Sequence, residues 1–170
     1  MKWSVLTLVG ADQSGIVATV TDKLYQQGCN LAQASMMRLG ANFAIMLRVS
    51  HDENKDLQVI LSDICTRLNL HLHIDEDVAE IAPGIEPNVQ ITVYGADRTG
   101  IVAQVTSALA QAGLNIIDLE TDVAGSKQKP IYIMSLEGVA QNGIEALQTA
   151  IDALQPDIEV NIDEINTLRG

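Results

Sequence analysis

Basic residues are scarce in this chain. Its 170 residues contain 10 Lys and Arg against 22 Asp and Glu, which gives a formal net charge of −12 at pH 7. Proteins that bind nucleic acid or an anionic membrane surface need a surplus of Lys and Arg facing phosphate groups. We therefore expect no direct contact with nucleic acid and no membrane partner.

Cysteines and long apolar runs are scarce as well. Cys29 and Cys65 lie far apart and form neither a CxxC pair nor another metal-ligand spacing. We predict two free thiols in a reducing cytoplasm, and a disulfide between them is the alternative that the sequence leaves open. No apolar run approaches the roughly 20 residues that a membrane helix requires. The apolar N-terminal stretch returns inside the chain as VQITVYGA, so residues 3–9 predict a strand rather than a signal peptide.

Motifs for catalysis are missing too. Gly10 and Gly15 have the GxxxxG spacing of a P-loop, but Ile16 stands where that motif requires Lys, and Ile101 does so in a second copy of the loop. No GxGxxG is present, and no motif gathers the cysteines and histidines into a nucleophile and a base. We predict that the protein is not an enzyme and needs no cofactor.

The histidines give only a weak indication of a metal site. His71 and His73 lie two apart on a predicted strand, and Asp75 and Asp77 continue the same face. Two His with carboxylates could bind zinc, but there is no HExxH motif and no equivalent pair later in the chain. We expect a solvated or interface strand face without metal. His51 stands in a polar loop, where we expect it to be exposed.

An internal repeat organises the sequence. Residues 10–20, GADQSGIVATV, return 85 positions later as residues 95–105, GADRTGIVAQV. Between residues 6–31 and 91–116 about half of the positions are identical. A period of this length is too long for a solenoid repeat and indicates a duplicated small domain.

The boundary between the copies is predicted from its turn-forming residues. The segment APGIEP, residues 82–87, places two prolines and a glycine between apolar stretches. We predict one domain over 1–82, a linker over 83–87 and a second domain over 88–170.

Hydrophobic periodicity predicts the same elements in each copy. In the first copy these are strands over 3–9, 31–39, 43–49 and 70–74, and helices from Ile16 to Gly28 and over 57–68. We predict an α+β protein of two ferredoxin-like βαββαβ domains, each a four-stranded antiparallel sheet with two helices on one face. Such a half leaves one sheet face and its edges uncovered. We therefore expect the halves to pack on each other or to dimerise, and the protein to be a homo-oligomer.

The repeated loop is the candidate site. It leads into a helix N-terminus, whose N–H groups and dipole favour an anion. If Ser14 and Thr99 cap the helices, Asp12 and Asp97 remain free to bind an ammonium group. The alternative is that the loop is only a tight turn before a capped helix. Asn30 and Asn115 open the following strands, and we place them at the same end of the sheet as the loops, where Asp, Asn and helix N–H groups could hold a free amino acid.

These motifs resemble those of ACT domains. The resemblance is carried by the element order, the GADQSGIV and GADRTGIV turns, and the strand entries QQGCNL and QAGLNI. Two such domains in a short chain resemble the glycine cleavage system transcriptional repressor group. The resemblance implies a regulatory module that binds a small amino acid, glycine or serine first, at a domain interface and acts on a DNA-binding activator protein. A ligand-free interaction adapter is the alternative.

The resemblance also implies ligand-binding positions. In this chain they correspond to Gly10, Asp12, Gly15, Ile16 and Asn30, and to Gly95, Asp97, Gly100, Ile101 and Asn115. The sequence does not distinguish which copy keeps a working site.

Overall fold

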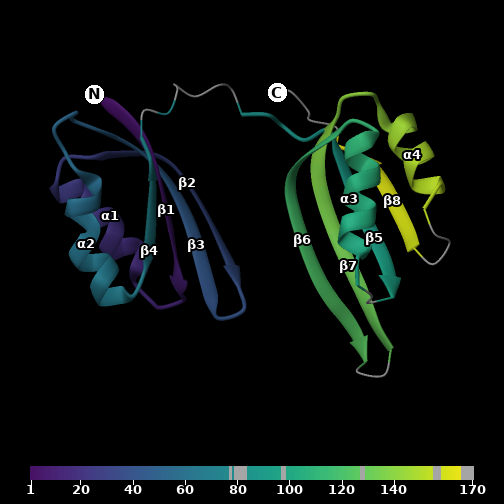
Figure 1. Ribbon diagram of the computed structural model, residues 1–170, viewed down its shortest axis with the longest axis horizontal. Coiled ribbons are helices and arrows are strands. Elements are labelled where there is room, and N and C mark those ends of the chain that lie inside the picture. The colour runs from purple at the N-terminus through teal and green to yellow at the C-terminus, as the bar shows by residue number, and fades with distance from the viewer. Residues whose placement is uncertain (77, 79–83, 97–98, 127–128, 155–157, 166–170) are drawn as a thin grey trace. The chain divides into compact units, whose positions relative to one another are not determined.

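The computed structural model describes residues 1–76, 78, 84–96, 99–126, 129–154 and 158–165. The chain divides into two compact units, Met1–Ala82 and Pro83–Gly170. Each has its own sheet and its own pair of helices (Figure 1). We describe them separately as unit 1 and unit 2.

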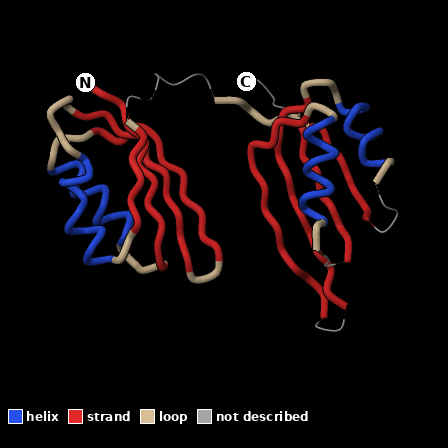
Figure 2. The backbone as a smooth tube through the Cα atoms, viewed as in Figure 1, coloured by secondary structure: helices blue, strands red, loops and turns tan. Residues whose placement is uncertain are grey.

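Unit 1 has the predicted order of elements. They are β1 (Lys2–Ala11), α1 (Ile16–Gln26), β2 (Asn30–Leu39), β3 (Asn42–His51), α2 (Leu57–Leu68) and β4 (His71–Asp75). The strands form one antiparallel sheet in the order β2-β3-β1-β4 (Figure 2). β1 runs longer than predicted because Gly10 and Ala11 continue its ladder against Phe43 and Asn42.

Unit 2 repeats this arrangement. Its elements are β5 (Val89–Ala96), α3 (Ile101–Gln111), β6 (Leu114–Ser126), β7 (Lys129–Ala140), α4 (Ile144–Asp152) and β8 (Ile158–Glu164). The strand order β6-β7-β5-β8 is the counterpart of that in unit 1. The predicted fold class, two ferredoxin-like domains, is confirmed.

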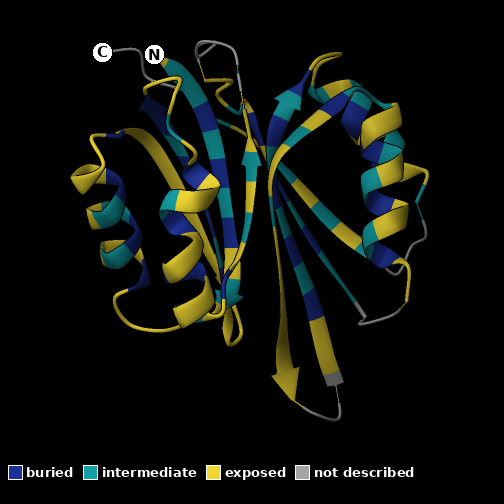
Figure 3. Ribbon diagram, turned by 60° about the vertical axis from the view of Figure 1, so that its left-hand side comes forward, coloured by how far each residue is buried: buried dark blue, intermediate teal, exposed yellow. Residues whose placement is uncertain are grey.

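The core of each unit lies between its sheet and its helices. In unit 1, Leu6 and Leu8 of β1 meet Val20 of α1 and Leu61 of α2, and none of the four is more than 1% exposed. Alternate residues of a strand point to one face, and one stripe of a helix faces the sheet. Both helices therefore cover a single face of the sheet, and the other face carries the remaining strand residues (Figure 3).

Local signals fix the ends of α2. Asp56 is its N-cap, with a carboxylate oxygen accepting from the backbone N–H of Val59 at 3.1 Å. The helix ends at Asn69, which adopts a left-handed φ of 51°. No helix in the described part of the chain is long and apolar enough to cross a membrane.

The edge strand β2 is uncovered along its whole length. All ten of its residues are exposed, and they include the large apolar side chains Met36, Met37 and Leu39. Its ladder with β3 is interrupted by a β-bulge between Leu31 and Gln33. An uncovered edge of this kind can pair with another strand.

The expectation that His51 is exposed is wrong. His51 ends β3 and is 4% exposed, with its Nε2 atom 2.9 Å from the hydroxyl of the fully buried Ser4. Its Nδ1 atom lies 2.9 Å from the carbonyl oxygen of Asp52. Because a carbonyl only accepts, Nδ1 carries the proton and Nε2 accepts from Ser4. The polar residues around His51 gave no indication that β3 continues past Val49. In the structure, β3 pairs with β1 as far as Lys2.

This buried pair predicts a measurable contribution to stability. We expect Ser4→Ala to lower the free energy of unfolding of unit 1 by about 1 kcal/mol, because a buried imidazole nitrogen loses its donor. Chemical denaturation followed by the fluorescence of Trp3, the single tryptophan, reports on this unit. Ser50→Ala is the matched control, since Ser50 is also a buried serine of this sheet and lies outside the Ser4–His51 contact. Equal losses in the two variants would contradict a role for the Ser4–His51 bond.

Candidate functional site

Helix α1 begins at a glycine in a left-handed conformation. Gly15 is its N-cap, with φ 88° and ψ 2°, and no side chain caps the helix. A Cβ atom built on Gly15 would meet nothing within 4 Å. The glycine is therefore required by the backbone angle, and the space around it is open. The expectation that Ser14 caps this helix is wrong, because the cap position falls one residue after Ser14.

Gly10 has a different reason to be glycine. A Cβ atom at this position would lie 2.7 Å from the Leu70 side chain and 3.1 Å from the carbonyl oxygen of Asn69. The missing side chain lets the start of β4 pack against β1. Gly10 thus has a structural role, because it makes room for Leu70 and Asn69.

Asp12 is not free, contrary to the expectation. One of its carboxylate oxygens lies 3.0 Å from the Nε atom of Arg38 on β2. Its backbone N–H donates to the carbonyl of Ala41 at 2.8 Å. The next residue, Gln13, donates from its side chain to the carbonyl of Leu68 at 3.2 Å. The loop is thereby held between the β2–β3 hairpin and the end of α2.

Arg38 is the residue that the sequence pattern did not single out. It is 66% exposed at the side chain, and its Nε atom also lies 3.3 Å from the carbonyl of Gly40. It stands opposite Phe43 of β3, whose side chain points into the core under the helices. Arg38 therefore projects from the helix-bearing face, beside the loop that starts α1. A charged residue at the end of an edge strand was the only sequence signal for it.

Ile16 and Ile101 contribute backbone N–H groups, and not their side chains, to the candidate sites. Their side chains are 3% and 2% exposed and belong to the cores of the two units. The N–H groups of the first turn of each helix remain available to an anion. A ligand at either helix start would therefore meet main-chain donors and not these side chains.

Asn30 lies at the other end of the sheet from Asp12, so the predicted meeting of the two within one unit is wrong. Asn30 pairs with Ser50, which in turn pairs with Trp3 near the start of β1. Asp12 follows the end of the same strand. The roughly eight residues between Trp3 and Asp12 span about 27 Å along the strand. One unit by itself cannot bring the amide and the carboxylate to one small molecule.

Unit 2 shows the same geometry where it is described. Gly100 is the N-cap of α3 with φ 90°, and no side chain caps this helix, so the prediction that Thr99 does so is also wrong. Gly95 lies within β5 opposite Tyr132. Asn115 is the second residue of β6 and pairs with Val139, far along the sheet from Gly95. Asp97 lies outside the described residues.

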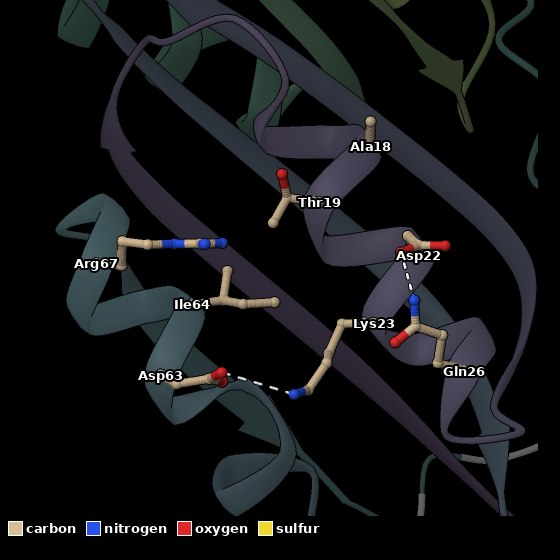
Figure 4. Close-up of a pocket in the computed structure, with 8 residues that line it drawn as sticks. All are labelled: Ala18, Thr19, Asp22, Lys23, Gln26, Asp63, Ile64 and Arg67. Carbon is tan, nitrogen blue, oxygen red and sulfur yellow. Dashed lines mark hydrogen bonds and ion pairs between the residues drawn. The ribbon is translucent and has the colours of Figure 1, made fainter.

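Unit 1 also has a groove between its two helices. Its volume is about 600 Å³, and Figure 4 shows it between α1 and α2. It is lined by Ala18, Thr19, Asp22, Lys23, Gln26, Asp63, Ile64 and Arg67. Lys23 pairs with Asp63 at 3.6 Å, and Gln26 donates to Asp22 at 2.7 Å. None of the predicted site residues lines it, so the groove is separate from the repeated loop.

The zinc alternative gains no support from the described residues. His73 and Asp75 are exposed, and the His73 Nε2 atom lies 3.2 Å from a carboxylate oxygen of Asp75. Within the described part of the chain, no group of three or more His, Cys, Asp and Glu is placed to hold a metal ion. Asp77 lies outside it.

Both cysteines are buried free thiols. Burial raises the pKa of the Cys29 thiol, while nearby Lys55 lowers it and Asp52 raises it. Burial, and then Asp63, raise the pKa of Cys65. Because the thiolate is the reactive form, neither cysteine has the environment of a nucleophile.

Comparison with known proteins identifies both halves of the chain. Models of the ACT domain match residues 4–75 and residues 89–155. The UPF0237 protein of Methanococcus maripaludis is 36% identical over 76 residues, which cover 45% of this chain and 83% of that protein.

A longer match joins the two halves. The glycine cleavage system transcriptional repressor of Escherichia coli is 27% identical over 118 residues, or 68% of this chain and 62% of the repressor. A crystal structure of a protein proposed to be such a repressor superposes with a TM-score of 0.70, covering 98% of each chain at 20% identity. The structural likeness shows that both units share the fold of that protein.

The left-handed start of α1 predicts a specific pattern of substitution. We expect Gly15→Ala to lower the free energy of unfolding of unit 1 by about 1–2 kcal/mol, because a Cβ atom strains this conformation. We expect Ser14→Ala to change it by less than about 0.5 kcal/mol, because Ser14 does not cap the helix. Denaturation followed by Trp3 fluorescence measures both. A loss of about 1 kcal/mol in Ser14→Ala would restore Ser14 as the cap.

Proposed function

Because the chain belongs to the ACT-domain family and carries two such domains in tandem, we propose that it is a non-catalytic regulatory protein that binds a small amino acid and modulates a protein partner. Its relatedness to the glycine cleavage repressor of Escherichia coli supports the regulatory role. That relationship also makes glycine the first ligand to test and serine the second. The partner that we propose is a transcriptional activator of glycine cleavage genes.

The observation that carries this proposal is the open, uncapped start of α1. The space beside Gly15 is open, and within the described residues no side chain forms a cap hydrogen bond at this helix start. Backbone donors at a helix N-terminus suit a carboxylate. Asp12, three residues earlier and 35% exposed at its side chain, is an acceptor suited to an ammonium group. A free amino acid presents both groups on a single carbon atom.

Asn30 and Asn115 can take part only through a second domain. About 27 Å separates Asn30 from the loop of its own unit, so its amide would have to reach the loop of another ACT domain. We propose that assembly supplies this contact, which also gives a reason for a homo-oligomer. The uncovered edge β2, on which Asn30 stands, is available for such pairing.

Regulation then follows from linkage. A ligand that binds one assembled arrangement more tightly than another shifts the population toward it by its difference in affinity. The partner responds to the population and not to the amino acid itself. The scarcity of basic residues supports a protein partner over DNA, and the two free thiols support a cytoplasmic location.

A second candidate function is a ligand-free adapter. It is favoured by the ion pair between Asp12 and Arg38, which already satisfies one carboxylate oxygen. It is also favoured by the fully exposed edge β2, which could accept a strand from a partner. In this case no amino acid would alter the stability of the protein or its complexes.

A ligand screen separates the two candidates. We expect glycine or serine at 100 times its dissociation constant to stabilise the protein by about 2.7 kcal/mol, which a thermal-shift assay detects. We expect Asp12→Ala to reduce this shift strongly. Thr7→Ala, a substitution on the same strand but outside the loop, is the control and should leave the shift unchanged. The absence of a shift with all twenty amino acids at millimolar concentration would favour the adapter.

A further inference from the structure

We infer that Asn142, in the turn before α4, is a site of spontaneous deamidation, and that its conversion to an acid breaks a contact between this turn and the end of α3. Unit 1 makes the equivalent contact with a lysine, which has no amide to lose. The inference goes beyond the proposed function and does not depend on it.

In each unit, the end of the first helix is hydrogen-bonded to the turn before the second helix. In unit 2, the Nδ2 atom of Asn142 donates to the carbonyl oxygen of Ala112, the C-cap of α3, at 3.2 Å. The backbone N–H of Gln141 donates to the carbonyl of Gly113 at 3.0 Å. Figure 1 shows the C-terminal end of α3 and the start of α4 at the same end of unit 2. We call these two hydrogen bonds the latch of unit 2.

Unit 1 makes the side-chain contact of the latch with a different residue. The Nζ atom of Lys55 donates to the carbonyl of Gln27, the C-cap of α1 and the counterpart of Ala112 in the sequence repeat. Lys55 stands immediately before the N-cap of α2, as Asn142 stands immediately before the N-cap of α4. The two side chains therefore occupy equivalent places and satisfy equivalent carbonyls.

Asn142 is favoured for deamidation because a glycine follows it. The chain has nine asparagines, and only Asn142 precedes glycine. The reaction requires the backbone nitrogen of the next residue to reach Cγ of the asparagine, and glycine has no side chain to hinder this approach. Gly143 is the N-cap of α4, so its N–H lies outside the hydrogen-bonded ladder of the helix. A Cβ atom built on Gly143 would meet nothing within 4 Å, so its surroundings are open as well.

The reaction consumes water and releases ammonia. The backbone nitrogen of Gly143 bonds to Cγ of Asn142, and the bond from Cγ to Nδ2 breaks. Nδ2 leaves as ammonia with the proton that the Gly143 nitrogen gives up. Water then opens the cyclic imide at one or the other carbonyl and restores the N–H of Gly143. The products are aspartate, or isoaspartate with the main chain routed through the former side chain.

Either product removes the side-chain donor of the latch. A carboxylate oxygen replaces Nδ2 opposite the carbonyl of Ala112, and both groups only accept hydrogen bonds. Ala112 also ends α3, where the helix dipole disfavours a negative charge. Asn142 is packed against this turn, since a Cβ atom built on Gly113 would lie 2.9 Å from its Cγ atom. The acid therefore destabilises the latch of unit 2 and leaves the Lys55 contact of unit 1 intact.

Peptide mass spectrometry of the aged full chain tests the reaction. The purified protein is incubated in mildly alkaline buffer at physiological temperature, and amide-to-acid conversion and isoaspartate are measured at each asparagine. We expect most of Asn142 to be converted while Asn30 and Asn69, which are exposed but followed by leucine, still keep their amides. Conversion at Asn142 no faster than at these two residues would overturn the inference.

Hydrogen exchange tests the consequence. In aged protein and in Asn142→Asp, we expect the amide of Gln141 to exchange about fivefold faster, as for the loss of one hydrogen bond. The amides of Gly28 and Cys29, which are hydrogen-bonded at the equivalent turn of unit 1, should keep their rates. Asn142→Lys is the matched control, because it copies the latch residue of unit 1, and it should neither convert nor exchange faster after ageing. Unchanged exchange in Asn142→Asp, or equal changes in both units, would contradict the inference.

Discussion

The parallel course of the first two strands in each unit is the constraint on which the rest of the structure depends. β1 and β2 both run antiparallel to β3, so they run parallel to each other, and α1 has to carry the chain back along the sheet. This return places the helix on one face and leaves the other face without a covering layer. It also fixes which groups can meet, because the loop after β1 and the first residue of β2 necessarily fall at opposite ends.

The loop after β1 is built from two kinds of glycine. Gly15 provides a backbone angle that other residues reach only with strain, and Gly10 provides room for Leu70 and Asn69. The same residue type thus serves a turn at Gly15 and close packing at Gly10. Outside the repeated motif, the two units also differ across the sheet, where unit 1 has Arg38 and unit 2 has Val123.

The fold was largely predictable from the sequence because its signals are local. Apolar residues at helical spacing, alternating residues on strands and a glycine after α1 determine each element without knowledge of distant contacts. The duplication strengthened the prediction of helices and strands, because each pattern occurs in both copies. The ends of strands were less predictable: β3 extends to His51 because β1 pairs with it, and that pairing is not visible in a polar stretch.

The candidate site was less predictable because it depends on contacts between distant residues. The ion pair of Asp12 with Arg38 joins residues from two elements, and no spacing rule connects them. The placement of Asn30 could have been corrected from topology alone. Eleven helical residues carry the chain about 16 Å back along the sheet, so the strand that follows α1 has to begin far from the loop.

The positions of the two bulges indicate whether the bulge arose before or after the duplication. β2 is irregular between Leu31 and Gln33, and β6 is irregular between Ile116 and Asp118, which is the same place after a shift of 85 positions. An extra residue so placed reverses the side-chain alternation along the rest of the strand. Two independent insertions at one register are far less economical than a single inherited one. The ancestral segment therefore already carried its bulge when it was copied, whereas the difference in hairpin length arose after the two copies had separated.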